Sequence, residues 1–194
     1  VTTPTSHAPQ SLAGHLLVLI RREGDFHDCW DSLVIGFVGM TSLDNDNGVG
    51  GLTFVWRGLT GHYLSAIQEE TLASLVERAT VLENRDVQRF RLILSREEIR
   101  RLIERLWIIK NTVDYRYRFF GVNCATMVLD TLNHAFEGGE EIALDVPLVA
   151  PLHIAAALDE HRRLGDPVYP EHWSIGKRAR QASAQNAEIR ARVL

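Results

Sequence analysis

The chain has 194 residues, 45% hydrophobic and 24% charged, which is typical of a folded globular protein with a substantial core. Its formal net charge of −4 does not indicate a nucleic-acid partner, because binding phosphates requires a strong basic field. No apolar run approaches the roughly 18 residues of a membrane-spanning helix, and the first residues lack the pattern of a signal peptide.

The first half of the chain is predicted to consist mostly of strands. A polar lead-in occupies residues 1–11, and a short helix is expected within 71–82. The Asp- and Asn-rich segment 42–51 is predicted to be a surface loop, and its spacing does not match a calcium-binding loop. Apolar or alternating runs predict four strands, over 14–22, 32–40, 52–59 and 87–94.

The second half is predicted to be helical. Ser95 and Glu98 have the spacing of a capping box, and apolar residues at helical spacing follow them to about Lys110. A second helix is expected to begin at residue 123 or 124 and to stop at the glycine pair 138–139. A third is expected to begin at Pro151 and to stop at Gly165. Strands followed by helices indicate an α+β fold, here as a single domain.

The two cysteines, Cys29 and Cys124, cannot form a disulfide framework, but they leave open one bridge or one reactive thiol. A thiol on a core-facing helix can be a small buried hydrophobe. The alternative is a nucleophile. Asn123 is a preferred helix N-cap residue, and the first helical position favours an anion, so the thiol pKa is expected to fall. Backbone N–H groups at the same helix start could also hold an oxyanion.

A nucleophilic thiol needs a base, and His15 is the histidine of interest among eight. It opens an apolar strand directly after Gly14, where no local feature requires an imidazole. It is therefore either a hydrogen-bonded core residue or the base that accepts the thiol proton.

Four segments, in this order, resemble a bacterial envelope family, the Lnb N-terminal periplasmic domain. The family shows Gly-His before an apolar strand, a basic-Gly-x-x-Gly-x-Tyr turn, a Leu-Ser-x-Glu-Glu helix start and an aromatic run that ends in Asn-Cys. The matching segments here are "SLAGHLLVLI", "GLTFVWRGLTGHY", "ENRDVQRFRLILSREEIRRLIERLW" and "YRYRFFGVNCATMVLDTLN". The resemblance covers about residues 11–136, with a family-like core over residues 12–136, and 137–194 is expected to be a helical C-terminal extension.

The resemblance implies a thiol enzyme similar to lipoprotein N-acyltransferases. The implied fold is permuted papain-like, similar to NlpC-type hydrolases and the lecithin:retinol acyltransferase group, in which a small antiparallel sheet packs on a helix that starts at the nucleophile. Cys124 would attack the acyl carbonyl, His15 would be the base, and Asn123 would orient the turn. Tyr117, or alternatively Tyr115, would donate to the oxyanion unless it serves only in packing.

The chain departs from the family pattern at several positions. His62 stands where the family commonly has glycine, which would be unfavourable if that position had a positive φ. The group that orients the base is not evident. Asp31 is the candidate, with His27 nearby, and Cys29 has no family counterpart.

Other functions remain open. The same residues would serve a cysteine hydrolase of the envelope, either an amidase or peptidase or a lipid esterase. A non-catalytic envelope domain that binds lipid or peptide is a third reading. Phe54 and Trp56 beside Arg57 are either core or a peripheral membrane contact. The expected partner is a lipid or an acylated or peptide substrate, with no cofactor and no metal site, and the expected location is the bacterial periplasm or cell envelope.

Overall fold

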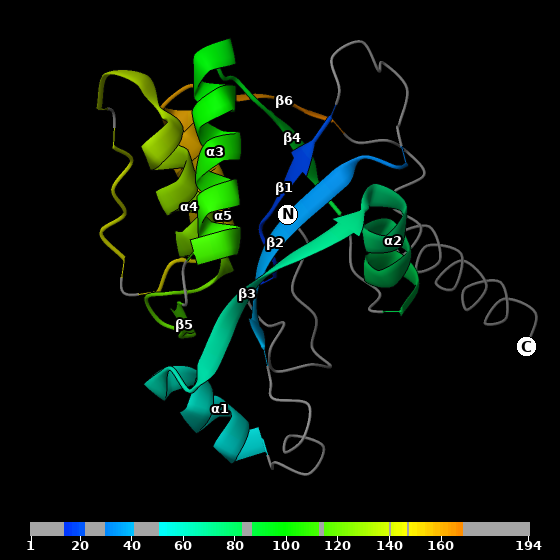
Figure 1. The fold of residues 1–194 in the computed structure, drawn as a ribbon, viewed down its shortest axis with the longest axis vertical. Helices are drawn as coiled ribbons and strands as arrows, with labels where there is room; N and C mark the ends of the chain where they lie inside the picture. Colours follow the sequence, from blue (N-terminus) through cyan, green and yellow to red (C-terminus); the bar gives the residue numbers. More distant parts are fainter. Residues whose placement is uncertain are drawn as a thin grey trace, which may run out of the picture.

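The computed structural model describes residues 14–21, 30–40, 51–82, 87–112, 115–139, 141–146 and 148–168. Figure 1 shows a twisted sheet with three helices packed together on one side of it. The strands are β1 (Leu17–Ile20), β2 (Leu33–Met40), β3 (Tyr63–Thr71), β4 (Arg89–Leu92), β5 (Arg116–Tyr117) and β6 (Leu164–Val168). The helices are α1 (Gly51–Thr60), α2 (Leu72–Glu77), α3 (Arg96–Thr112), α4 (Cys124–Ala135) and α5 (Pro151–Glu160), with a π-helical turn η2 (Arg78–Leu82) and a 3-10 turn η3 (Glu137–Gly139). The predicted α+β class is confirmed.

The main sheet is antiparallel, with the strand order β1-β2-β3-β5. β2 is the long strand next to the edge strand β1, and it pairs with β3 along its whole length. β5 contributes only two residues and places Tyr117 opposite Tyr63 at the end of β3. A separate two-stranded sheet joins β4 and β6.

The alternation of side chains along β1 and β2 separates two apolar clusters. Leu16 and Val18 point into the main core, which β1 and β2 share with α3, α4 and α5. Leu17 and Leu19 pack against a smaller cluster built around α2 and Val34. The sheet therefore holds α4 on one face and α2 on the other.

The largest error of the sequence prediction is segment 52–59, which is not a strand but most of helix α1. Leu52, Val55, Trp56 and Leu59 recur at i, i+3, i+4 and i+7, which is helical spacing, and a short apolar run alone does not distinguish helix from strand. Strand β3 was not predicted. Its sequence, YLSAIQEET, is rich in polar residues, and its place between β2 and β5 makes it a strand.

The helical half follows the prediction closely. The α3 capping box is formed, and α4 begins at Cys124. Helix α5 begins at Pro151 but ends at Glu160, five residues before the predicted stop. Ile142, Ile154 and Leu158 lie in the main core, so the segment after residue 136 contributes to it. The lead-in, Cys29, most of the 42–51 loop and the chain after residue 168 lie outside the described residues.

Candidate thiol site at the start of helix α4

The start of α4 is held by the side chain of Asn123. Its Oδ1 accepts hydrogen bonds from the backbone N–H groups of Ala125 (2.9 Å) and Thr126 (3.1 Å). The Thr126 hydroxyl in turn accepts from the Asn123 N–H at 2.9 Å, which completes a capping box. This N-cap leaves Cys124 as the first helical residue, as the sequence predicted.

The amide nitrogen of Asn123 connects this helix start to two other segments. Nδ2 donates to the carbonyl oxygens of Phe119 (3.1 Å) and Val149 (3.0 Å), in the aromatic run before α4 and in the segment before α5. Asn123 is only 7% exposed, so these polar groups have little access to water. An aspartate could cap the helix equally well, but it could not donate these two bonds. Asparagine is therefore the residue type that this position requires.

The Cys124 side chain is a free thiol that is only 5% exposed. Burial raises its pKa, which outweighs hydrogen bonds that favour the thiolate, from the Leu16 backbone N–H, the Tyr117 hydroxyl and the Ala125 N–H. The expectation from the sequence, that the helix start would lower the thiol pKa, is therefore wrong. The thiol is neutral at pH 7 and can become a nucleophile only when a base removes its proton.

Tyr117 brings its hydroxyl to this thiol from the opposite edge of the sheet. Burial and the neighbouring Cys124 raise its pKa, while a hydrogen bond with the Cys124 backbone N–H opposes the rise. The hydroxyl therefore lies beside both the sulfur and the first N–H of α4. Two donors next to a nucleophile are what an oxyanion requires.

A glycine on β2 lets the Tyr117 ring cross the sheet. A Cβ on Gly39 would stand 2.9 Å from Cδ1 of that ring, a separation that real Cβ atoms essentially never show. The ring also meets Phe119 edge to face, with 6.3 Å between ring centroids. The sequence analysis did not select Gly39, and its only signal is a glycine late in an apolar strand.

Two motifs that lie far apart in the sequence meet next to this tyrosine. Gly58 in the "RGLTGHY" segment accepts a hydrogen bond from the Phe119 N–H at 2.9 Å, and a Cβ there would lie 2.2 Å from the Phe119 ring. Gly61 has a φ of 75° and packs against the Arg118 side chain. The glycines of this turn thus seat the aromatic run that leads to Asn123 and Cys124.

His15 lies directly before β1, and its side chain is half-buried. The next peptide N–H, that of Leu16, is the one that donates to the Cys124 thiol. His15 also lines a cavity of about 30 Å³, together with Gln68 of β3 and Arg78. Because Leu16 faces Cys124 and side chains alternate along a strand, the His15 side chain lies on the α2 face of the sheet, with Gln68 and Arg78, and not beside the thiol.

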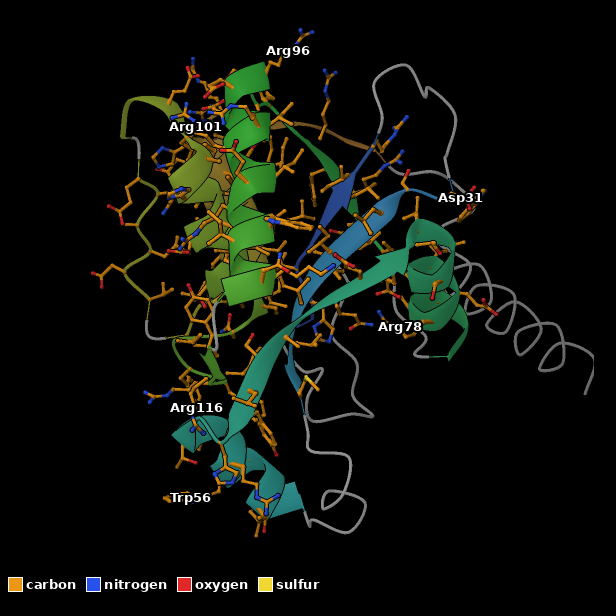
Figure 2. All side chains as sticks on the ribbon, in the orientation of Figure 1. Asp31, Trp56, Arg78, Arg96, Arg101 and Arg116 are labelled. Carbon is orange, nitrogen blue, oxygen red and sulfur yellow. The ribbon has the colours of Figure 1, made fainter. Side chains whose placement is uncertain are left out.

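The other predicted site residues have different positions. Asp31 is exposed in the turn before β2, at the end of the sheet where Leu33 pairs with Ile20. His15 is at the opposite end of β1, five residues or roughly 17 Å along the strand, so Asp31 does not orient its imidazole. Figure 2 shows Asp31 beside α2, away from β5.

The other two candidates near the aromatic run, His62 and Tyr115, have different surroundings from Tyr117. His62 is exposed after α1, where its N–H donates to the Arg57 carbonyl at 2.9 Å. The positive φ of that turn falls on Gly61, so a side chain at position 62 causes no backbone strain. Tyr115 is half-buried against the main core, and its carbonyl accepts from the Ser65 N–H at 2.7 Å, which fits a packing role.

A second cavity, of about 880 Å³, runs along β1. Its lining begins at Leu16, and it includes Val128 and Leu132, one and two turns along α4 from Cys124. The remaining lining is mostly apolar and comes from β1, β2, α2, β4, α3 and α5, and it includes four arginines, Arg21, Arg89, Arg91 and Arg96. This volume is in the range of small-molecule sites.

The fold and the site define an α+β domain with a buried thiol at a capped helix start. A family model of the Lnb N-terminal periplasmic domain matches residues 1–159, and the chain belongs to this family. The match reaches beyond the 12–136 core expected from the motifs and includes most of α5. The location is therefore the bacterial periplasm or cell envelope. No curated protein and no solved structure matches the chain significantly.

Two further features can be stated for the described residues. Among them, no helix is long and apolar enough to cross a membrane. Within the same residues, no group of three or more His, Cys, Asp or Glu side chains is arranged to hold a metal ion.

Proposed function

We propose that this domain is a thiol-dependent acyltransferase in which Cys124 is the nucleophile and His15, once its side chain turns around the edge strand β1, is the general base. The observation that carries the proposal is the contact of the Cys124 thiol with the Tyr117 hydroxyl and with the N–H of Leu16, the residue after His15. The order His then Cys, and a helix that starts at the cysteine and packs on an antiparallel sheet, support a permuted papain-like arrangement.

The neutral thiol makes the base necessary. In the proposed first step, the His15 side chain turns around the edge strand β1 to the face that carries Cys124 and takes the thiol proton. The sulfur then attacks the carbonyl carbon of an acyl ester. The oxyanion forms beside the Tyr117 hydroxyl and the Cys124 N–H. The carbon–oxygen bond then breaks, the alcohol leaves with the proton from the imidazolium, and a thioester remains on Cys124.

The second step transfers the acyl group to an amine. The amine nitrogen attacks the thioester carbon, His15 removes the amine proton, and the carbon–sulfur bond breaks. The released sulfur recovers that proton, so the product is an amide and the free thiol. If water replaced the amine, the same residues would release a carboxylic acid, which is the hydrolase alternative.

The cavity beside β1 supports an apolar acyl group. It adjoins Leu16 and follows α4 from the first turn after Cys124, so a chain attached to the sulfur could extend along Val128 and Leu132. A peptide substrate would not need an apolar cavity of this size, which makes the lipid-derived acyl donor the better supported substrate.

The test is mass spectrometry of the intact chain after incubation with p-nitrophenyl esters of increasing acyl length. We expect a hydroxylamine-labile acyl adduct on Cys124, which is absent in Cys124→Ala and forms at least about a hundredfold more slowly in His15→Asn. His62→Asn is the matched control and should react like the native chain. A native chain that forms no adduct, or a His15→Asn variant that is as fast as native, would contradict the mechanism.

A pair of neighbouring alanines on α5 tests the acyl site. Ala155 lines the cavity, whereas Ala156 is exposed. Ala155→Phe should reduce the reaction with long-chain esters about tenfold or more and leave the acetyl ester unaffected, because the new ring occupies space that only a long chain needs. Ala156→Phe should change neither. An equal loss with acetyl and long-chain esters would place the acyl chain elsewhere.

A further inference from the structure

Helix α1 has an apolar face that is open to solvent. Leu52 is 89% exposed and Trp56 67%, while Val55 and Leu59 are 39% and 38% exposed. Their i, i+3, i+4, i+7 spacing puts all four on one side of the helix, and we call them the α1 apolar face. Figure 1 shows α1 at one end of the molecule, apart from the layer formed by α3, α4 and α5. The exposed ring of Phe120 lies in the run that bonds to this helix.

The charged side chains that the structure describes on α1 and in the aromatic run are all basic. Residues 51–65 and 115–125 contain Arg57, Arg116 and Arg118 and no Asp or Glu, in a chain whose net charge is −4. Arg116 pairs with Leu64 across β5 and β3, next to the end of α1. Figure 2 shows Trp56 and Arg116 projecting outward at this end of the molecule. The surface therefore combines an apolar helix face with a basic surrounding.

Helix α3 offers an informative contrast. Its exposed stripe contains Ile99, Ile103 and Trp107, and Trp107 is 66% exposed, almost the same as Trp56. Acidic residues accompany this stripe, since Glu97 and Glu104 lie on the same helix and form ion pairs with Arg100. An exposed tryptophan is thus present on both helices, but α3 carries acidic side chains beside its stripe, whereas α1 itself, residues 51–60, contains no Asp or Glu.

We propose that α1 docks this domain on an anionic phospholipid bilayer, with its apolar face in the interface and Arg57, Arg116 and Arg118 against the headgroups. Amphipathic helices with Trp and Leu on one face and basic residues beside it bind in this way, and tryptophan favours the membrane–water boundary. The anionic surface is chosen because it complements the arginines. A neutral protein partner would gain less from them, and a second copy docked symmetrically through α1 would bring the same arginines together.

The docked helix would be coupled to the thiol by rigid contacts. Gly58 leaves no room between α1 and the Phe119 ring, and Phe119 packs on Tyr117, whose hydroxyl contacts Cys124. Docking through α1 would therefore hold the start of α4 near the bilayer surface. The docking itself does not depend on catalysis.

The experiment measures sedimentation of the full chain with vesicles of phosphatidylcholine alone or with phosphatidylglycerol. We expect binding to the anionic vesicles, weakened by 0.5 M salt in accordance with charge screening. Leu52→Ser combined with Trp56→Ser should reduce partitioning by about tenfold or more, and Arg116→Gln by about fivefold. Trp107→Ser is the matched control and should bind like the native chain, as should Cys124→Ala, which separates docking from the proposed chemistry.

A second readout locates the bound helix and does not rely on a loss of binding. Lipids with brominated acyl chains should quench tryptophan emission in the native chain and in Trp107→Phe, and much less in Trp56→Phe, which keeps an apolar ring. Absence of binding to anionic vesicles, or equal binding to both kinds, would overturn the proposal. Loss of binding in Trp107→Ser alone would assign docking to α3, and a dimer that Trp56→Ser dissociates would assign the face to a second copy.

Discussion

The starts of α3 and α4 are built alike but treat an acidic group in opposite ways. Each helix has a capping box, and each carries a buried ionisable side chain in its first turn, Glu98 in α3 and Cys124 in α4. The pKa of Glu98 is lowered, whereas the pKa of Cys124 is raised. The helix start alone therefore does not decide whether a buried group is charged.

The partners of the two groups account for the difference. Burial opposes ionisation of Glu98, but its carboxylate accepts from the backbone N–H groups of Ser95 (2.8 Å) and Glu137 (3.1 Å) and pairs with the Arg163 guanidinium at 3.1 Å. Arg163 is itself held over the Phe136 ring, 4.5 Å from its centroid. Burial also opposes ionisation of Cys124, whose donors from Leu16 and Tyr117 are uncharged. For Glu98, the Arg163 cation and the close N–H donors outweigh burial and keep the carboxylate charged. Glu98 therefore has a structural role.

Removing the charge at the start of α3 tests whether the Glu98 network stabilises the fold. Glu98→Gln should lower the free energy of unfolding by about 3 kcal/mol, because it leaves Arg163 facing a buried site without its carboxylate. Urea denaturation would measure it, with Glu97→Gln, an exposed neighbour, as the matched control that should have no measurable effect. Equal stability of the two variants would show that the Glu98 network is not structural.

The corresponding change at the start of α4 should affect chemistry instead. Tyr117→Phe is expected to slow thioester formation about a hundredfold, the usual effect of losing one oxyanion donor, with little change in melting temperature because the ring still packs on Gly39 and Phe119. Tyr115→Phe is the control and should react at the native rate. A native rate in Tyr117→Phe would reduce Tyr117 to a packing residue.

A substitution at the α4 cap tests how the thiol site is held. Asn123→Asp preserves the cap but should cost about 2 kcal/mol, because a carboxylate would face the Phe119 and Val149 carbonyls that now accept hydrogen bonds. Asn133→Asp is the matched variant, since its amide likewise donates to a carbonyl, that of Ile142 at 3.0 Å. Both should lower stability, but only Asn123→Asp should change the rate at which iodoacetamide alkylates Cys124. The same change in both would separate Asn123 from the thiol.

The opposite pKa shifts predict stability losses at opposite ends of the pH scale. The lowered pKa of Glu98 means that its contribution is complete above its ordinary value of 4.5 and is lost as the pH falls below it. The raised pKa of Cys124 means that the native state keeps a proton which the unfolded chain releases, so stability falls as the pH rises above 9.0.

Each slope should be about 1.4 kcal/mol per pH unit for the single proton involved. Denaturation series in acid and in base would measure them against two variants. Glu98→Gln should reduce the slope of only the acid limb and Cys124→Ala that of only the alkaline limb, to which the raised pKa of Tyr117 contributes as well. An alkaline limb that is identical with and without Cys124 would contradict the raised thiol pKa.

The sequence predicted what depends on local signals. The capping box at Ser95, the N-cap at Asn123 and the apolar periodicity behind them place α3 and α4 correctly, since these signals act within a few residues. Strands β3, β5 and β6 were missed because pairing with distant segments, and not their own composition, makes them strands. Segment 52–59 was misassigned because its apolar residues were taken for a buried strand, whereas they form an exposed helix face.

The candidate site shows the same limit. Cys124 and Asn123 could be selected from the sequence because an N-cap and its first helical residue are adjacent. The thiol environment could not be predicted, because Tyr117 reaches it across the sheet over Gly39, and the Leu16 N–H comes from an edge strand more than a hundred residues earlier in the chain. The error on the thiol pKa has this origin. Asp31 failed as a candidate because β2 runs antiparallel to β1, so the start of β2 lies beside Ile20, at the end of β1 away from His15.

The hydrogen bond from the Leu16 N–H to the Cys124 sulfur gives the chain an internal spectroscopic label. The resonance frequency of an amide proton that is hydrogen-bonded to sulfur changes when that sulfur becomes a thiolate. The hydrogen bond is lost when the sulfur carries an acyl group. The amide signal of this one leucine in a nitrogen-15 spectrum would therefore distinguish the resting, ionised and loaded states of the thiol without any substitution in the protein.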